Sequence, residues 1–435
     1  MTMGVTEIAL AVLACLWPLL RMAGWHRIRT IATAYVILAV VVLTLMLLVG
    51  AGRWPLAPAI LLVLLWEVQA SAVMVGDIPP PGDSRWPLVI YGMALVVLAV
   101  PAGLLALVVL PRVPPIVGTG PFMVGVRDVV IADSTGADSL AGRQVTVRLW
   151  FPGEPESDLR PLGPPDRVEV LEAALAEQLI GRPWGRVVRG VTRARVGAST
   201  PMRLSSSRRD FPVVILARPG GNPILFRRLA VQLASHGFLV AEPVGQERGL
   251  GSLPWAADAS GAPGAPADVG AAESLVAGLR ALGTPGSGDR LAGRLQLEQF
   301  GWVGVGPAVR TGRQLAAVGT VAALVAIGAA GPSSGELDAP PELLLEELGA
   351  PTIAGGATIR TAMPGAQPID FSDLAWWSPF LLRRAGSGGF VPAARMEAWI
   401  QGWTTAFLGV HLAAVPGDSL RALASRFPGT TVSLP

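Results

Sequence analysis

Lysine is absent from this chain, and cysteine and histidine are scarce. All 34 basic residues are arginine, and the 435 residues include one cysteine, Cys15, and three histidines, His26, His236 and His411. One cysteine excludes an intrachain disulfide, and scattered histidines give no metal-site spacing. No stretch combines clustered arginine with interleaved aromatic residues, as nucleic-acid-binding segments do. We therefore expect no metal, no cofactor and no nucleic-acid partner.

Charged residues are also few, at 15% of the chain, against roughly 25% in an average soluble protein. The deficit lies mainly in the first 110 residues, which contain four apolar runs. Each run is close to the roughly 20 residues that a helix needs to cross a bilayer. The sequence therefore predicts a four-helix transmembrane anchor over residues 1–112 and a second domain over 113–435. The four runs cover about Val5–Leu20, Ile31–Val49, Leu56–Val75 and Leu88–Leu110.

The charges between the apolar runs predict an orientation. The first connection carries Arg21, Arg27 and Arg29, and an arginine excess marks a cytoplasmic loop. Both the N-terminus and the large domain then lie outside the inner (plasma) membrane, in the periplasm. Membrane lipids are the partners that follow. Glu67 is a carboxylate well inside the third run; such a residue is a functional candidate, but a position near a helix end or beside a partner explains it as well.

After Pro111 the pattern changes to alternating strands and helices. Phe211–Ala217 is a continuous apolar run, which is typical of a strand buried on both faces. Leu225–His236 has helical spacing and is followed by Gly237, a common residue after a helix end. Such alternation predicts a mostly parallel sheet with helices on both faces. Further strands are expected at Val129–Ile131, Val145–Trp150, Phe238–Ala241, Phe300–Val305 and Ala322–Ile327, and further helices at Ala271–Leu282 and Val309–Val318.

Several motifs in the second domain occur in a known order. The sequence resembles the bacterial membrane-anchored relatives of platelet-activating-factor acetylhydrolase, which are α/β-hydrolases. That resemblance implies a serine on a G-x-S-x-G elbow, activated by an acid and a histidine. The residues that carry it include Val145–Pro152 (VTVRLWFP), Leu233–Phe238 (LASHGF), Phe300–Gly304 (FGWVG) and Phe371–Leu374 (FSDL).

At the catalytic positions this sequence departs from the family. The elbow reads Gly-Val-Gly-Pro-Ala over 304–308, which puts Gly306 in place of the serine. Ala330 stands where the family has its acid, and Pro368 where it has its histidine. The residue after the nucleophile normally donates its backbone N–H to the oxyanion, but Pro307 has none. The other oxyanion loop is replaced by Arg218-Pro-Gly-Gly221.

Other chemistry-bearing residues give weaker predictions. His236 is best interpreted as a structural residue at a helix end, and His411 as a packing or surface residue. Asp370 and Asp373 favour a solvated loop or a helix cap over acid–base chemistry. Trp376-Trp377 predicts core or lid packing, with an interface or membrane-surface anchor as the alternative.

Loss of the whole triad in an intact frame suggests that the domain is not an enzyme. We therefore expect a non-catalytic pseudo-hydrolase that serves as a structural or accessory subunit of a larger membrane complex, with other integral-membrane subunits as partners. One alternative is a lipid- or acyl-ligand-binding protein that uses the former active-site pocket. The other is a residual esterase or lipase with relocated catalytic residues.

Overall fold

The computed structural model describes residues 113–132, 144–161, 196–218, 225–244, 269–328, 341–347, 358–376, 389–428 and 431–433. The chain divides into two units, Met1–Pro111 and Arg112–Pro435, and all described residues belong to the second. The predicted anchor over residues 1–112, with Glu67, lies outside the described residues.

One sheet of ten strands organises the second unit, in the order β1-β3-β2-β5-β4-β6-β7-β8-β9-β10, and β1 also pairs with β2. The six strands from β5 to β9 are mutually parallel, whereas β2 pairs antiparallel with β5 and β10 antiparallel with β9. The strands are β1 (Met123–Ala132), β2 (Gln144–Pro161), β3 (Ala198–Leu204), β4 (Phe211–Ala217), β5 (Leu239–Val244), β6 (Leu295–Val305), β7 (Val321–Ile327), β8 (Glu342–Glu347), β9 (Thr358–Met363) and β10 (Thr431–Ser433).

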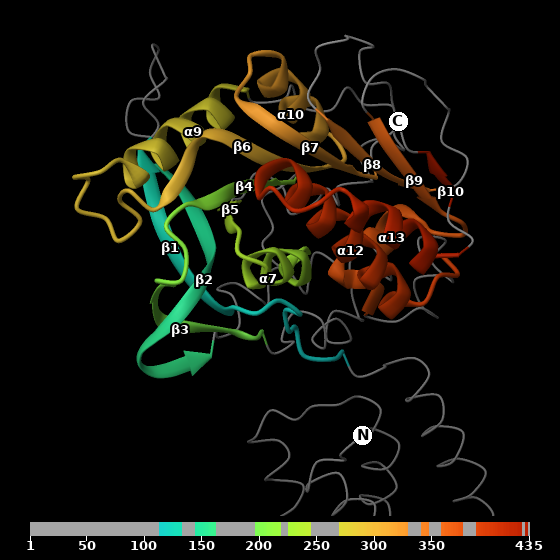
Figure 1. Ribbon diagram of the computed structural model, residues 1–435, viewed down its shortest axis with the longest axis horizontal. Helices are drawn as coiled ribbons and strands as arrows, with labels where there is room; N and C mark the ends of the chain where they lie inside the picture. Colours follow the sequence, from blue (N-terminus) through green and yellow to red (C-terminus); the bar gives the residue numbers. More distant parts are fainter. Residues whose placement is uncertain are drawn as a thin grey trace, which may run out of the picture. The chain divides into compact units, whose positions relative to one another are not determined.

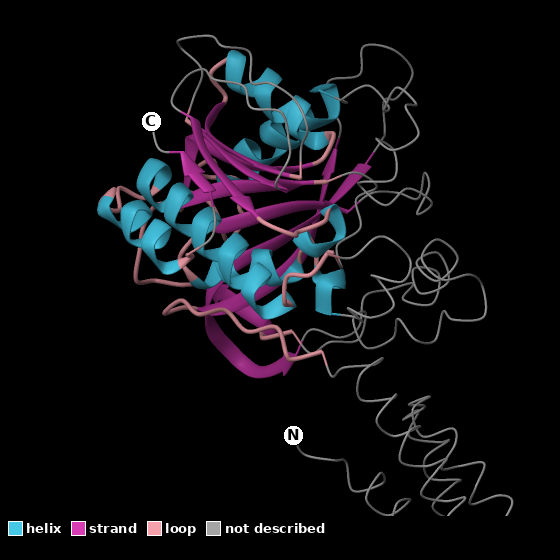
Figure 2. Cartoon of the chain, turned by 90° about the vertical axis from the view of Figure 1, so that its right-hand side faces the viewer, coloured by secondary structure: helices cyan, strands magenta, loops and turns pink. Residues whose placement is uncertain are grey.

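Helices cover both faces of the parallel strands (Figures 1 and 2). One face packs against α7 (Arg227–Ser235) and α12 (Ala393–Leu412), with α13 (Asp418–Arg426) beside α12. The other face packs against α9 (Val269–Gly283) and α10 (Ala308–Ala317). Among the described residues, each side of the sheet thus has a large hydrophobic core of its own, and Val309, Ala326 and Leu344 form a small further cluster.

Local sequence explains these elements. Every residue of β4 is buried, as a continuous apolar run in a parallel strand requires. Helix α7 ends just before Gly237, whose φ of +96° is the left-handed conformation that glycine adopts without strain. Helix α10 buries Val309, Gly312 and Leu315, which share one helical face.

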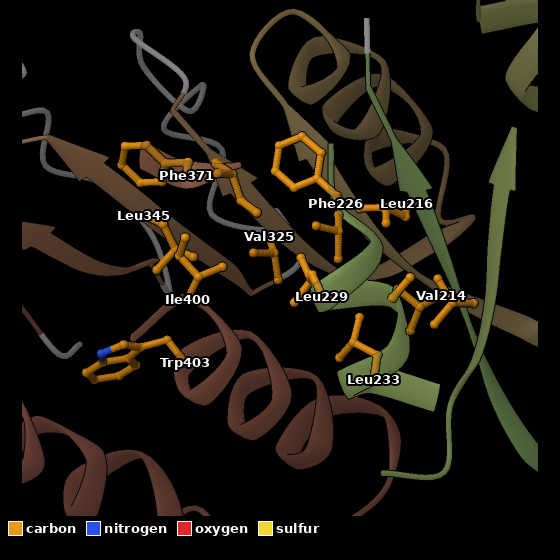
Figure 3. Close-up of a cluster of buried hydrophobic side chains, with 14 of the residues drawn as sticks. Val214, Leu216, Phe226, Leu229, Leu233, Val325, Leu345, Phe371, Ile400 and Trp403 are labelled. Carbon is orange, nitrogen blue, oxygen red and sulfur yellow. The ribbon is translucent and has the colours of Figure 1, made fainter. Parts of the chain in front are cut away.

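The core on the α7 and α12 side joins these two helices to the sheet. Figure 3 shows its members: Val214 and Leu216 from β4, Leu229 and Leu233 from α7, and Ile400 and Trp403 from α12. All six side chains are at most 5% exposed. Burial of each contributes roughly 1.5–3 kcal/mol, so this core fixes α7 and α12 firmly against the sheet.

The predicted fold class needs a correction. Among the helices of the described residues, none is long and apolar enough to cross a membrane. The combination of a four-helix membrane anchor with an α/β domain is therefore replaced by an α/β domain. Sequence hydropathy alone favoured the anchor, and the four apolar runs on which it rested are in residues 1–112.

Candidate functional site at the carboxyl edge of the sheet

The turn from β6 to α10 is a tight strand-to-helix elbow. Gly306 has a φ of +54°. Its N–H donates to the carbonyl of Ile327 (3.0 Å), and its own carbonyl accepts from Val309 N–H (3.1 Å). A Cβ on Gly304 would lie 2.8 Å from the Cα of Val309, so only glycine lets α10 start this close to the strand. This is the backbone shape that a G-x-S-x-G motif builds.

The elbow carries no reactive side chain. Gly306 offers no nucleophile, and Pro307, at φ −59° before α10, has no N–H for an oxyanion. Pro368 begins the short helix η5 (Pro368–Phe371) after β9. Because β6 and β9 are parallel strands of one sheet, Gly306 and Pro368 lie at the same edge. Ala330 and residues 219–221 lie outside the described residues.

The segment after β9 crosses this edge. Strands β6, β7 and β8 separate β9 from β4 in the sheet. Yet Asp373, in η6 (Asp373–Trp376), donates its N–H to the carbonyl of Leu225 (2.7 Å), just before the helix that follows β4. Phe371 packs against Trp399 of α12 on the way, with ring centroids 6.1 Å apart. The crossing brings the η5–η6 segment onto the first turn of α7.

A charged cluster forms where the η5–η6 segment, α7 and α12 meet. The guanidinium of Arg228 donates to both carboxylate oxygens of Glu397 (3.1 and 3.2 Å) and to the carbonyl of Pro114. It also stacks over the ring of Trp376, 4.8 Å from its centroid. Trp376 Nε1 (2.7 Å) and Gln401 Nε2 (3.0 Å) donate to the same carboxylate. Glu397 is thus held in one orientation by three donors.

Asp373 is the buried carboxyl of this cluster, and its side chain accepts from the backbone N–H of Arg228 (3.4 Å). Burial raises the pKa of Asp373 to about 7, while Arg227 and Arg228 oppose the rise and Glu397 adds to it. Asp373, Glu397 and Arg228 line a cavity with about 20 Å³ of water-accessible space. That volume holds about one water molecule. A carboxyl with a pKa near neutrality beside a water-sized space can act as a general base.

The two aspartates of the η5–η6 segment differ from the expectation of a solvated loop. Asp370 and Asp373 are each only 6% exposed, because the segment crosses the sheet edge under α12. The helix-cap interpretation fits Asp370, whose Oδ2 accepts from the N–H groups of Gln367 and Gly389 (2.9 Å each). Asp373 also accepts a hydrogen bond from the first turn of α7, and burial raises its pKa to about 7.

A second buried ion pair lies at the end of β4. The side chains of Arg218 and Glu242 are 1% and 0% exposed and form a short salt bridge. Trp150 Nε1 donates to the other oxygen of Glu242 (3.0 Å). Burial lowers the pKa of Arg218, and Glu242 partly restores it. This pair joins β2, β4 and β5 next to the elbow strand.

The histidines and tryptophan have structural roles. His236 is the C-cap of α7, and its Nε2 lies 3.1 Å from Thr119 Oγ1. His411 stacks on Phe407 at the end of α12, with centroids 4.6 Å apart. Partial burial lowers the pKa of both imidazoles. Trp376 packs under Arg228, whereas Trp377 lies outside the described residues.

Sequence reasoning did not single out Arg227, Arg228, Glu242 or Glu397. One signal was available, because Glu242 interrupts the apolar strand β5 and the two arginines open an otherwise apolar helix. Within the described ranges, no group of three or more His, Cys, Asp and Glu residues could hold a metal ion. The expected absence of a metal and a cofactor stays a prediction.

Comparison with known proteins identifies the fold. No family model and no curated protein sequence matches the chain. Among solved structures, a ferulic acid esterase from Streptomyces cinnamoneus is similar, with a TM-score of 0.55 and 21% identity over 74% of this chain and 99% of that one. The domain therefore has an α/β-hydrolase-type fold, as the sequence predicted. The comparison contains nothing specific to platelet-activating-factor acetylhydrolases or to a membrane anchor.

Two predictions about function are corrected by this finding. The solved structure that shares this fold is an esterase, so the prediction of a non-enzyme is withdrawn. No finding supports a structural subunit of a membrane complex. Both predictions came from the family's catalytic positions, where Gly306, Ala330 and Pro368 replace the triad and Pro307 removes an oxyanion donor. That argument overlooked the charged cluster at the same edge. The four residue assignments themselves stay predictions.

Proposed function

We propose that the domain is a hydrolase-like protein that acts on a carboxylic ester through a water molecule activated by Asp373. The observation that carries the proposal is the buried Asp373 carboxyl, with a pKa of about 7, against a water-sized cavity at the carboxyl edge. In open α/β sheets, ligands bind at this edge. The fold shared with an esterase supports the reaction class.

The proposed reaction needs no serine. Ionised Asp373 takes a proton from water while the water oxygen forms a bond to the ester carbonyl carbon. The C–O bond to the alcohol then breaks, and the alcohol oxygen receives the proton from Asp373. The products are a carboxylic acid and an alcohol, and Asp373 is regenerated. Arg227 and Arg228, which interact with Asp373, supply positive charge near the developing oxyanion.

The resemblance to relatives of platelet-activating-factor acetylhydrolase favours an acyl ester as the substrate class. The ordered motifs, including Leu233–Phe238 and Phe371–Leu374, support this choice. The cavity is lined on its apolar side by Phe226, Leu229 and Ile400. These side chains place an apolar surface beside the polar reacting atoms.

The test is hydrolysis of p-nitrophenyl acetate by the full chain, with and without Asp373→Asn. We expect wild-type turnover to rise as pH increases through about 7 and to fall by roughly 10²–10⁴-fold in the variant. Asp289→Asn is the matched control, because Asp289 pairs with Arg127 near β1 and should leave the rate unchanged. A fluorophosphonate should label no serine, since the elbow carries glycine.

Three outcomes would contradict the proposal. The first is no turnover above buffer with p-nitrophenyl esters of short and medium acyl chains. The second is an Asp373→Asn variant with the wild-type rate and pH profile. The third is a serine labelled by the fluorophosphonate in step with loss of activity.

Binding of an acyl ligand without turnover is a second candidate. Gly306 and Pro307 favour it, because they keep the elbow open while removing a nucleophile and a donor. Ligand retained after purification and identified by mass spectrometry, without ester turnover, would support binding over hydrolysis. The expected partners, which are membrane lipids and integral-membrane subunits but no nucleic acid, stay predictions, as does the periplasmic side of the inner membrane.

A further inference from the structure

The guanidinium of Arg218 has one edge in use and one edge without a partner. Its Nη1 pairs with Glu242, whereas Nε and Nη2 are buried and have no hydrogen-bond partner among the described residues. Nε and Nη2 form the side-on fork of a guanidinium, with two parallel N–H groups. A carboxylate fits that fork with both oxygens. The unpartnered atoms are therefore the pair that recognises a carboxylate.

Burial makes this fork unusual. The Arg218 side chain is 1% exposed, so bulk water does not reach the two N–H donors. Buried donors without partners cost free energy, and native proteins keep few of them. Arg218 directly follows β4, at the same edge as the elbow. A ligand that satisfies both donors would remove the cost.

The charges around Arg218 also favour an anion. Arg218 and Arg227 both interact with Glu242 and Asp373. Arg148 also acts on Arg218, but its guanidinium is paired with Asp128 through two hydrogen bonds of 2.8 Å. Burial raises the pKa of Asp373 to about 7, so at neutral pH this carboxyl offers the two buried guanidiniums less than a full negative charge.

We propose that the Nε–Nη2 fork of Arg218 is a binding site for a carboxylate group. The ligand class is the carboxylic acid released from an ester. The proposal rests on the proposed function for the origin of that acid, but binding itself requires no turnover. Arg218, the first residue of the segment that replaces the oxyanion loop, would thus supply donors for a negatively charged oxygen.

The test is binding of benzoate to the full chain by isothermal titration calorimetry, with neutral benzamide as the matched ligand. We expect benzoate to bind more tightly than benzamide by roughly tenfold or more, because a charged pair is lost with the amide. Arg218→Lys keeps a cation for Glu242 but removes the fork, and should weaken benzoate binding by a similar factor. Arg360→Lys, in the separate Arg360–Glu346 pair, should bind benzoate as wild type does.

A variant that fails to fold does not end the test. The double variant Arg218→Met with Glu242→Gln removes both buried charges, and such replacements are often neutral for stability. It too should lose the preference for benzoate. Equal binding of benzoate and benzamide, no binding of either, or wild-type benzoate binding by a folded variant would overturn the proposal. Ester turnover is not measured, so failure here is distinct from failure of the hydrolase proposal.

Discussion

The elbow at Gly306 and the charged cluster around Asp373 lie at one edge of the sheet but carry different kinds of information. The elbow keeps a demanding backbone shape, with a positive φ and a close approach of helix to strand. It has no side chain that can react. The cluster gathers five charged groups: Arg227, Arg228, Asp370 and Asp373 are buried, and Glu397 is partly exposed. Shape and chemistry are therefore separated in this molecule, and each can be altered alone.

The largest effect is expected from breaking the buried pair beside the elbow. Glu242→Leu leaves the Arg218 guanidinium buried without a counter-charge and removes the acceptor of Trp150. We expect the free energy of unfolding to fall by about 3–5 kcal/mol. Urea denaturation followed by tryptophan fluorescence measures it. A loss below that of an exposed pair would mean that Arg218 finds another partner.

The next effect concerns the pH dependence of stability. The pKa of Asp373 is about 7 in the folded protein, whereas an aspartate in the unfolded chain has a pKa of about 3.8. Between these values the folded state binds more protons than the unfolded state, so this group's contribution to stability decreases as pH rises from about 4 to 7. The decrease is at most about 4 kcal/mol. Asp373→Asn should flatten it.

Urea midpoints of the wild type and Asp373→Asn at several pH values between about 4 and 8 test this point. The stability of the wild type should fall relative to that of the variant as pH rises, because only the wild type has a carboxyl that must lose its proton. Parallel curves would show that Asp373 titrates normally and would remove the support for a general base.

A smaller effect is expected at the elbow. Gly306→Ser forces an L-residue into φ +54°, which costs about 1–2 kcal/mol. Gly319→Ser is the matched control, since Gly319 has φ +76° and no atom within 4 Å of a new Cβ. The Gly306→Ser protein should still resist a fluorophosphonate, because Pro368 replaces the activating histidine. Labelling of the new serine would show that an activating base exists.

The smallest effect is expected far from both regions. Arg421 and Asp418 form an exposed pair on α13, 3.5 Å apart and 81% and 90% exposed. Arg421→Ala should change the free energy of unfolding by about 0.5 kcal/mol or less, because solvent screens the pair. A larger loss would mean that charge on this surface matters as much as buried charge.

Much of the sheet could be predicted from the sequence. The continuous apolar run at Phe211–Ala217 and the glycine after α7 identified β4 and the helix end, because burial and positive φ each restrict the residue types. Strands β8 and β9 were missed: β8 reads ELLLEE and β9 TIRTAM. The buried Glu346 of β8 pairs with Arg360 of β9 (2.6 Å). Pairing between strands, which a local pattern does not contain, makes such sequences extended.

The candidate site was predicted in part. The family resemblance singled out Gly306, Pro307 and Pro368, and the strand order of the structure brings Gly306 and Pro368 to the same edge. The cluster of Arg228, Asp373 and Glu397 was not, since its members are up to 169 positions apart in the chain. The anchor predicted over 1–112 rested on hydropathy, which reports how apolar a segment is and not which structure it forms.

By itself the sequence determined the α/β alternation, the elbow shape at Gly304–Gly306 and the absence of a serine there. These are local properties, set by glycine conformation, proline chemistry and apolar runs. Only the tertiary structure decided that Asp373 is buried rather than solvated, and that one edge of Arg218 is left for a ligand. Both depend on which elements pack over a side chain, and burial of a charge changes its pKa and its need for partners.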